Sequence, residues 1–463
     1  MMRGLPFLPL LVAGPLLSAC DLAPHYARPA SAAPSQWPQG ASYDTPGSAE
    51  AAGMPWRSLI GNSKLQSVIG QALVNNRDLR AAVANLASAR AQYHIQRSEQ
   101  LPTIAAGAGA TIERGITSGT LDTNSYSTSI GMSSFEIDLF GRLKNLTREA
   151  FETYLATQSG ARSTRLAIVA ETATAYVTLA SDRDLLKVAR ETEASGQRSL
   201  ELTQSLFHSG LTNASDVQNA ITVVEQAKSD VENFTTAVAQ DRNALELLVG
   251  APVDEALLPT SLSEVDDSIA AVPAGLSSTV LLQRPDVLEA EHSLKSANAG
   301  IGAARAAFFP TITLTSAVGV ASTALSSLFT GGALNWSAAP SASLPVVGGP
   351  TKGNLQFAKA QRDYYLALYE KAVQQAFKDV ADGLARRGTI TRQRQAQQRL
   401  VAAAAKAYTL ADAQYRAGTD SFLNALTAQR TLYASRQTEI GAILTDINNR
   451  ITLYQAIGAD QSL

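Results

Sequence analysis

Cysteine and histidine are the residue types that most often bind metals or act as nucleophiles, and both are rare in this chain of 463 residues. The single cysteine, Cys20, excludes an intramolecular disulfide and any cysteine cage for zinc or an iron–sulfur cluster. The sequence has no phosphate-binding loop, nucleophile elbow or GxGxxG fingerprint. The four histidines form no HExxH motif and no i,i+4 pair, and they are His25, His94, His208 and His292. We therefore expect neither an enzyme nor a resident cofactor or metal.

The charge of the chain excludes a further class of partner. The 38 basic and 40 acidic residues leave a net charge of -2, and no basic face for nucleic acid is predicted. Only 17% of residues are charged, against about 25% in an average soluble domain. This composition is typical of closely packed helices with mildly polar faces.

Lipid attachment at Cys20 is the covalent chemistry that the sequence predicts. Residues 1–19 have the pattern of an export signal, because their apolar stretch is too short and too often broken by proline to span a bilayer. The tetrapeptide Leu17-Ser18-Ala19-Cys20 resembles the bacterial lipoprotein box, in which the cysteine receives acyl chains such as palmitate. The alternative is an ordinary signal peptide with an incidental cysteine. Asp21 follows, and in some bacteria an aspartate there favours retention in the inner membrane.

The chain repeats itself at a constant offset of 208 residues. This period is far longer than that of solenoid repeats, so each half is predicted to be a whole subdomain. The predicted organisation is an extended segment 20–65, a first half 66–251, a linker 252–280 and a second half 281–463. The offset relates Pro102-Thr103-Ile104 to Pro310-Thr311-Ile312, Asp78 to Asp286, Gly210 to Gly418, Arg242 to Arg450 and Gly250-Ala251 to Gly458-Ala459.

Proline-free runs show where long helices can form, because proline inside a helix costs about 3 kcal/mol. Residues 103–251 and 351–463 contain none. We expect very long helices from about Lys144 to Leu206 and from about Gly353 to Tyr415. Apolar residues that recur every seven positions predict coiled-coil packing of the following helices: Val217, Val224, Val231, Val238 and Leu245, then Leu426, Tyr433, Ile440, Ile447 and Tyr454. A soluble four-helix bundle is the alternative.

Each half also contains a strand-compatible segment between its first two helices. We expect β-hairpins within 103–139 and 310–346, with strands over 103–113, 124–139, 311–321 and 334–346. Their lengths suit tilted membrane strands, which need about 9 to 11 residues. Beyond Cys20 no run of about 18 apolar residues occurs, so a membrane crossing would require a closed barrel. Four strands are too few to close one, whereas three chains together would supply twelve.

Several motifs together resemble the TolC-type outer-membrane efflux proteins, in particular the lipoprotein branch that serves resistance-nodulation-division (RND) pumps. The resemblance covers nearly the whole mature chain. The motifs are the lipoprotein box, Phe135-Glu136-Ile137-Asp138-Leu139-Phe140-Gly141-Arg142, the segment from Gly210 to Ala220, Leu282-Gln283-Arg284-Pro285-Asp286 and the segment from Ala297 to Pro310.

The resemblance implies a mixed α and β membrane protein. Its homotrimer would form a 12-stranded β-barrel, with four strands per chain, continued by a long α-helical coiled-coil tunnel. Segments 20–65 and 252–280 would belong to an equatorial α/β collar. The implied location is the bacterial outer membrane, where the lipid on Cys20 anchors the chain and most of it lies in the periplasm. The implied partners are outer-membrane lipid, a periplasmic adaptor (membrane fusion) protein and an inner-membrane RND transporter.

The implied function is that of a passive exit duct for drugs or other small molecules in a tripartite efflux pump. The alternatives are a duct for metal-ion efflux or protein secretion, and a coiled-coil periplasmic lipoprotein without a pore. The cargo is not predicted by the sequence.

The family pattern also marks the junctions between strand and helix. Gly141 allows the chain to turn between Phe140 and Arg142, and Arg142 is expected to anchor the junction. The second half departs from the family at Val347, Gly348 and Lys352, so its corner is expected to differ in detail.

The turns at Gly210-Leu211 and Gly418-Thr419 correspond to the periplasmic tip that contacts the adaptor. The resemblance places the gate at Asp216, Leu423, Asn424 and Thr427, where the family has acidic rings and an apolar constriction. Because Asn424 and Thr427 are neutral, we expect one remaining acidic ring, at Asp216, and a closed tip held mainly by apolar packing. The alternative is that Asp216 only caps a helix.

Overall fold

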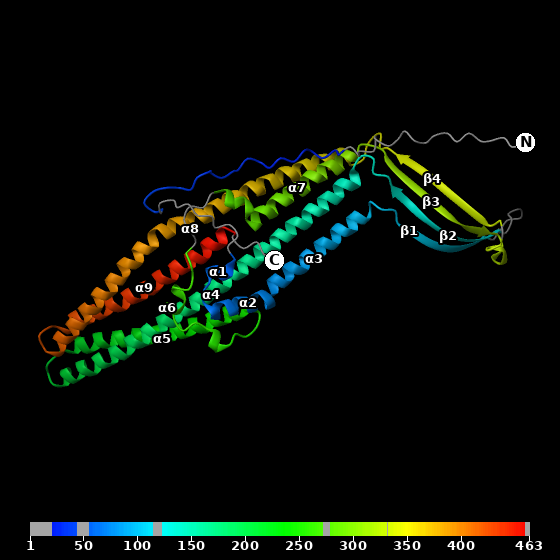
Figure 1. Cartoon of the computed structure of the whole chain (residues 1–463). Coiled ribbons are helices and arrows are strands. Elements are labelled where there is room, and N and C mark those ends of the chain that lie inside the picture. The colour runs from blue at the N-terminus through cyan, green and yellow to red at the C-terminus, as the bar shows by residue number, and fades with distance from the viewer. Residues whose placement is uncertain (1–20, 44–54, 114–122, 272–277, 331, 459–463) are drawn as a thin grey trace, which may run out of the picture. The chain divides into compact units, whose positions relative to one another are not determined.

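The computed structural model describes residues 21–43, 55–113, 123–271, 278–330 and 332–458 (Figure 1). Cys20, the predicted lipidation site, lies outside these residues. The chain divides into two compact units, each assembled from three segments. The sheet unit comprises Met1–Ala30, Asn85–Gln158 and Glu289–Glu370, and the hairpin unit comprises Ser31–Ala84, Ser159–Leu288 and Lys371–Leu463.

The two halves have the same order of elements. In each half, helix is followed by a β-hairpin and then by two long helices. Segment 20–65, which was predicted to be extended, contains the short helix α1 (Trp56–Leu59) and the start of α2 (Ser63–Asn75). The first half continues with α3 (Arg77–Ser98), β1 (Ile104–Glu113), β2 (Thr123–Glu136), α4 (Arg142–His208) and α5 (Ala214–Val249). The linker contains η1 (Glu255–Leu257), α6 (Ser263–Asp266) and η2 (Ser278–Gln283). The second half contains α7 (Pro285–Ala306), β3 (Thr311–Ser322), η3 (Leu325–Ser327), β4 (Leu334–Ser343), α8 (Thr351–Arg416) and α9 (Phe422–Ala456).

The sheet is antiparallel, with strand order β1-β2-β3-β4, so the two hairpins meet where β2 pairs with β3. The strands β2 and β4 are shorter than predicted, ending at Glu136 and Ser343. The register between β2 and β3 shifts between Met132 and Phe135, where Ser134 adopts a positive φ of 51°. Pro345 lies two residues beyond the end of β4 and has no N–H to donate to a strand ladder, which accounts for the earlier end of that strand.

Large apolar side chains on the sheet face outward from the single chain. Trp336 on β4 keeps 78% of its surface exposed, and every residue of β1 and β4 is exposed. Within the described residues, β1 and β4 each pair with one strand only. The other exposed apolar residues are Ile104, Ile112, Ile130, Val318 and Leu334.

Among the described residues, no helix combines the length and the apolar character that crossing a bilayer requires. The long helices α4 and α8 contain 67 and 66 residues. They begin two residues before the predicted starts and end one or two residues beyond the predicted ends.

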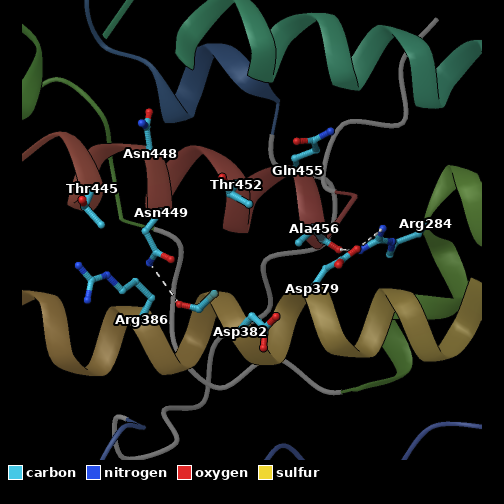
Figure 2. Close-up of a pocket in the computed structure, with 11 residues that line it drawn as sticks. Arg284, Asp379, Asp382, Arg386, Thr445, Asn448, Asn449, Thr452, Gln455 and Ala456 are labelled. Atoms are coloured by element: carbon cyan, nitrogen blue, oxygen red, sulfur yellow. Dashed lines mark hydrogen bonds and ion pairs between the residues drawn. The ribbon is translucent and has the colours of Figure 1, made fainter. Parts of the chain in front are cut away.

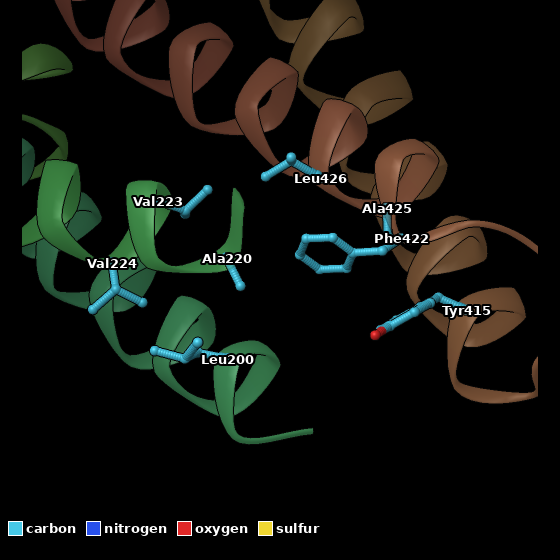
Figure 3. Packing of buried hydrophobic residues seen from close by; sticks show 8 residues of the cluster. All are labelled: Leu200, Ala220, Val223, Val224, Tyr415, Phe422, Ala425 and Leu426. Atoms are coloured by element: carbon cyan, nitrogen blue, oxygen red, sulfur yellow. The ribbon is translucent and has the colours of Figure 1, made fainter. Parts of the chain in front are cut away.

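In the hairpin unit, α4 with α5 and α8 with α9 form two helical hairpins that pack together. A cluster of buried residues joins them, with Phe422 directed toward Ala220 and Val223 (Figure 3). The aromatic rings of Tyr415 and Phe422 lie 5.2 Å apart, and the Tyr415 hydroxyl lies 3.0 Å from the hydroxyl of Thr203 on α4. The predicted seven-residue stripes contribute directly to the core through Val224, Leu245, Leu426, Ile440, Ile447 and Tyr454, all of which are buried.

The linker packs on the same unit. Its apolar side chains Leu258, Leu262, Val265 and Ile269 are buried. Ile269 also forms an antiparallel bridge with Ile60, which follows α1. The linker is therefore part of the folded hairpin unit.

Candidate functional site

The two tip turns close their helices in the same way. Gly210 and Gly418 have φ angles of 72° and 73°, the left-handed conformation that glycine adopts most easily. The N–H of Leu211 donates to the Leu206 carbonyl at 2.9 Å, and the N–H of Thr419 donates to the Gln414 carbonyl at 3.0 Å. These bonds from the residue after glycine define the Schellman motif, which satisfies carbonyls at a helix end. Leu211 and Thr419 are left exposed at the turns.

Asp216 lies in the first turn of α5, but it does not cap the helix. Asn213 is the N-cap, and its side chain accepts the backbone N–H of Asp216 at 2.9 Å. The Asp216 carboxylate accepts the Thr212 hydroxyl at 2.5 Å and is half-buried. A carboxylate there is favourable near the positive end of the helix dipole.

The other three predicted gate residues lie together on the first turns of α9. Leu423, Asn424 and Thr427 are exposed, and 60% of the Leu423 surface is accessible. The Thr427 hydroxyl donates to the Leu423 carbonyl at 2.8 Å. The four predicted gate residues therefore lie at the starts of α5 and α9. The buried cluster that joins the hairpins includes Ala220 of α5 and Phe422 of α9 (Figure 3).

Asp420 is an acidic tip residue that the sequence analysis missed. Its carboxylate accepts the Asn424 side-chain amide and the Ser421 backbone N–H, each at 2.7 Å. Asp420 lies just before α9, and this contact places its carboxylate beside Asn424, a neutral residue of the predicted gate. An aspartate four residues before Asn424 was the available signal.

The junction between β2 and α4 is fixed by a bidentate ion pair. Arg142 donates to the two carboxylate oxygens of Glu136 at 2.8 and 2.5 Å. Gly141 has a φ of 72°, and its carbonyl accepts the side chain of the fully buried Asn145 at 2.7 Å. The ring of Phe140 stacks on Phe309, with centroids 4.7 Å apart.

The equivalent corner before α8 has another construction. Two consecutive glycines, Gly348 and Gly349, have φ angles of 80° and 82°. Val347 is 94% exposed, and no ion pair of Lys352 is found within the described residues. The departures seen in the sequence therefore replace an ion-paired corner by a glycine turn.

A polar groove of about 460 Å³ runs between α8 and α9 in the hairpin unit (Figure 2). Asn449 on α9 points toward α8 and donates to the Gly383 carbonyl at 3.2 Å. At one end, Arg284 donates to Asp286 at 3.0 and 2.7 Å and to the Ala456 carbonyl. Pro285 begins α7, and proline is favoured in the first turn of a helix.

Two carboxylates also meet between the long helices of the first half. Burial first, and then the neighbouring Asp182 on α4, raise the pKa of Asp241 on α5 to about 6. One oxygen of Asp241 is buried without a hydrogen-bond partner. Among the described residues, no three His, Cys, Asp or Glu side chains are grouped so as to hold a metal ion.

A duplicated chain with four membrane-length strands, two hairpins of very long helices and paired glycine tip turns defines an outer-membrane efflux protein. The sequence profile described as "Outer membrane efflux protein" matches residues 68–251 and 276–459, and the chain belongs to this family. It is therefore an outer-membrane component of the efflux type, as the sequence analysis predicted.

Relatives cover nearly the whole chain. The antibiotic efflux pump outer membrane protein ArpC and the toluene efflux pump outer membrane protein TtgC, both of Pseudomonas putida, are each 43% identical over 97% of this chain and 95% of their own length. The crystal structure of CusC, whose title refers to transmembrane channel formation, has a TM-score of 0.86 and 37% identity, covering 95% of this chain and 100% of that chain. These likenesses confirm the predicted fold family.

Proposed function

We propose that three copies of this chain form the outer-membrane duct of a tripartite efflux pump. The observation that carries the proposal is the sheet: in the part of the chain that the structure describes, its outer strands β1 and β4 each pair with one strand only, and its large apolar side chains are exposed. Unpaired backbone groups in lipid cost several kcal/mol each, so both edges require partners. Pairing β4 of one copy with β1 of the next closes a barrel of twelve strands around a cyclic trimer.

The long helices would continue this barrel as a tunnel. At about 1.5 Å per residue, a helix of 67 residues extends roughly 100 Å. The packed hairpins of α4–α5 and α8–α9 supply the coiled-coil wall of each copy. Such a tunnel carries cargo passively and needs no catalytic group.

The tip would close and dock the duct. Three-fold symmetry triples each gate residue around the pore axis. Leu423 then supplies the apolar constriction, Asn424 and Thr427 supply neutral hydrogen bonds, and Asp216 supplies an acidic ring. The exposed turns at Gly210-Leu211 and Gly418-Thr419 form the surface that meets the periplasmic adaptor, which connects the duct to an inner-membrane RND transporter.

A lipid on Cys20 would add a second attachment to the outer membrane. Each buried methylene contributes about 0.8 kcal/mol, so two or three acyl chains anchor a protein stably. As cargo we propose small apolar organic molecules, because the relatives ArpC and TtgC are named for antibiotic and toluene efflux.

Planar-bilayer recording with the detergent-purified protein tests the duct directly. We expect stepwise ion currents and a native mass of three copies with their lipids. A stable monomer, or a trimer that gives no current, would contradict the proposal. Toluene and antibiotic tolerance of cells with and without the gene then tests the cargo, and unchanged tolerance to both would exclude it.

A further inference from the structure

The segment that follows the predicted lipidation site is bound along its length to the sheet unit. Residues 21–28, which we name the strap, contact α4 and α7. The Leu22 carbonyl accepts Arg305 at 2.9 Å, and the Pro24 carbonyl accepts the Asn298 side chain at 2.8 Å. Both donors belong to the segment 297–310 that the sequence analysis singled out, so this segment serves as a docking surface for the strap.

A glycine on α7 makes room for the strap. A Cβ atom on Gly302 would lie 2.9 Å from the Cα of Ala23 and 2.7 Å from the side chain of Asn145. Cβ atoms essentially never approach other heavy atoms within 3.0 Å. Asn145 is fully buried and held by Gly141. Any larger residue at position 302 would therefore displace the strap.

The far end of the strap is anchored on a buried carboxylate. The side chain of Glu291 on α7 is only 3% exposed. It accepts Arg28 at 2.6 Å, Lys295 at 3.0 Å and the Tyr26 hydroxyl at 3.2 Å. A buried carboxylate is stable only while it is paired, so this contact strongly favours the docked strap.

At the N-terminal end of the strap, the Asp21 carboxylate pairs with a cationic side chain. Asp21 accepts Arg148 of α4 at 2.8 Å and the Ala23 N–H at 3.1 Å. An isolated surface pair contributes only about 0 to 1 kcal/mol. The docked strap holds the Asp21 carboxylate within reach of the Arg148 guanidinium, which raises the effective concentration of one group at the other. The carboxylate next to Cys20 is thus neutralised by the folded protein.

We propose that the docked strap masks Asp21 and so allows the lipidated chain to leave the inner membrane. The inference rests on the proposed lipid attachment at Cys20. A free carboxylate beside the acyl chains would face the ammonium head groups of zwitterionic lipids, and it would carry the retention signal noted in the sequence. Paired with Arg148, the same carboxylate is unavailable to a head group or a sorting protein.

Membrane fractionation of the full-length chain tests the masking, in a host that retains aspartate-bearing lipoproteins in its inner membrane. Residues 1–30 fused to an unrelated soluble reporter, which has no Arg148, calibrate the host. In Arg148→Gln we expect the inner-membrane share to rise about fivefold, as loss of about 1 kcal/mol of pairing implies. Asp21→Ser and the double variant should both reach the outer membrane, and Arg148→Lys should restore most of the sorting.

Arg90→Gln is the matched control, because Arg90 is an exposed cation on α3 of the same unit. It should sort like the wild type. An unchanged inner-membrane share for a stable Arg148→Gln variant would overturn the masking. If that variant fails to accumulate, Gly302→Val with and without Asp21→Ser decides instead, because it undocks the strap while Arg148 remains. If Gly302→Val alone and Gly302→Val with Asp21→Ser divided between the two membranes in the same way, the masking would also be overturned. Mass spectrometry of the wild-type N-terminus that found no lipid on Cys20 would refute the lipid attachment itself, and the masking with it.

Discussion

Asn76 and Arg284 occupy equivalent positions in the two halves, 208 residues apart, and each holds the end of the last helix of its half. The Asn76 side chain donates to the Leu248 carbonyl of α5 at 2.8 Å, and Arg284 donates to the Ala456 carbonyl of α9. These two carbonyls are also 208 residues apart. The duplication has therefore preserved one contact while changing the side chain that makes it.

This contact predicts unequal stability effects in the two halves. Arg284 is only 7% exposed and also pairs with Asp286. Arg284→Ala should lower the free energy of unfolding by about 3 kcal/mol, because it removes a buried side chain that binds both Asp286 and the Ala456 carbonyl. Asn76→Ala removes neutral hydrogen bonds and should cost about 1 to 2 kcal/mol. Thermal unfolding followed by circular dichroism measures both, and equal losses would contradict the assignment.

The two acidic residues at the tip, Asp216 and Asp420, are both predicted to contribute to the cation preference of the channel. Asp420 and Asp216 both carry carboxylates at the helix starts, and no ion pair with either is found in the described part of the chain. In the proposed trimer three copies meet around one axis, so each neutralisation removes three charges. Single-channel recording of Asp216→Asn and Asp420→Asn should show reduced cation preference and weaker block by divalent ions in both.

The double variant of these two aspartates should lose most of the cation preference. Asp230→Asn is a charge-matched control, because Asp230 lies further along α5 and binds the Tyr433 hydroxyl. An Asp216→Ala channel with unchanged preference and block would remove Asp216 from the ring. An unchanged Asp420→Asn channel would leave Asp216 as the only acidic ring.

The sequence predicts the long helices and tip turns because their causes are local. The absence of proline, the seven-residue stripes and Gly210 and Gly418 act within a few turns of chain. Contacts made across the fold carry no such local signal. The strap's contact with Gly302, for example, joins residues almost 280 positions apart. The predicted gate rests on a family pattern, and that pattern has no place for Asp420.

The carboxyl pair of Asp182 and Asp241 predicts a stability that depends on pH. The pKa of Asp241 is raised to about 6 in the folded chain, whereas an unfolded aspartate titrates near 4. Folding then favours the protonated acid, so the stability from this group is present below about pH 4 and is lost as the pH rises through about 6. Asp241→Asn should therefore raise the Tm at pH 7.5, and the gain should vanish near pH 4.

The second half supports this substitution, because Asn449 occupies the equivalent position and its amide binds the Gly383 carbonyl. Asp182→Asn should shift the Tm in the same direction, since it removes the same repulsion. Glu232→Gln, an exposed carboxylate on α5, is the control and should leave the pH profile unchanged. Identical Tm values for the wild type and Asp241→Asn at pH 7.5 would show that the pair is not strained.

A network of four charges fastens the linker to the second half. Arg394 of α8 lies 2.5 Å from both Asp266 of the linker and Asp446 of α9. Arg450 contacts Asp446 at 2.6 Å and donates to the carbonyls of Asp266 and Ile269 at 2.9 and 3.0 Å. These side chains are at most 22% exposed, so water replaces a lost partner poorly.

Arg394→Met should therefore lower the free energy of unfolding by about 3 kcal/mol, because two carboxylates lose a buried partner. Adding Asp266→Asn should recover part of this loss, since it removes one of the stranded charges. Lys378→Met provides the surface control: the pair with Asp382 is exposed on both sides, and its loss should cost less than about 1 kcal/mol. High salt should reduce the small control effect and leave the Arg394 effect largely intact. Denaturant unfolding that gave equal losses for Arg394→Met and Lys378→Met would show that the network does not hold the linker.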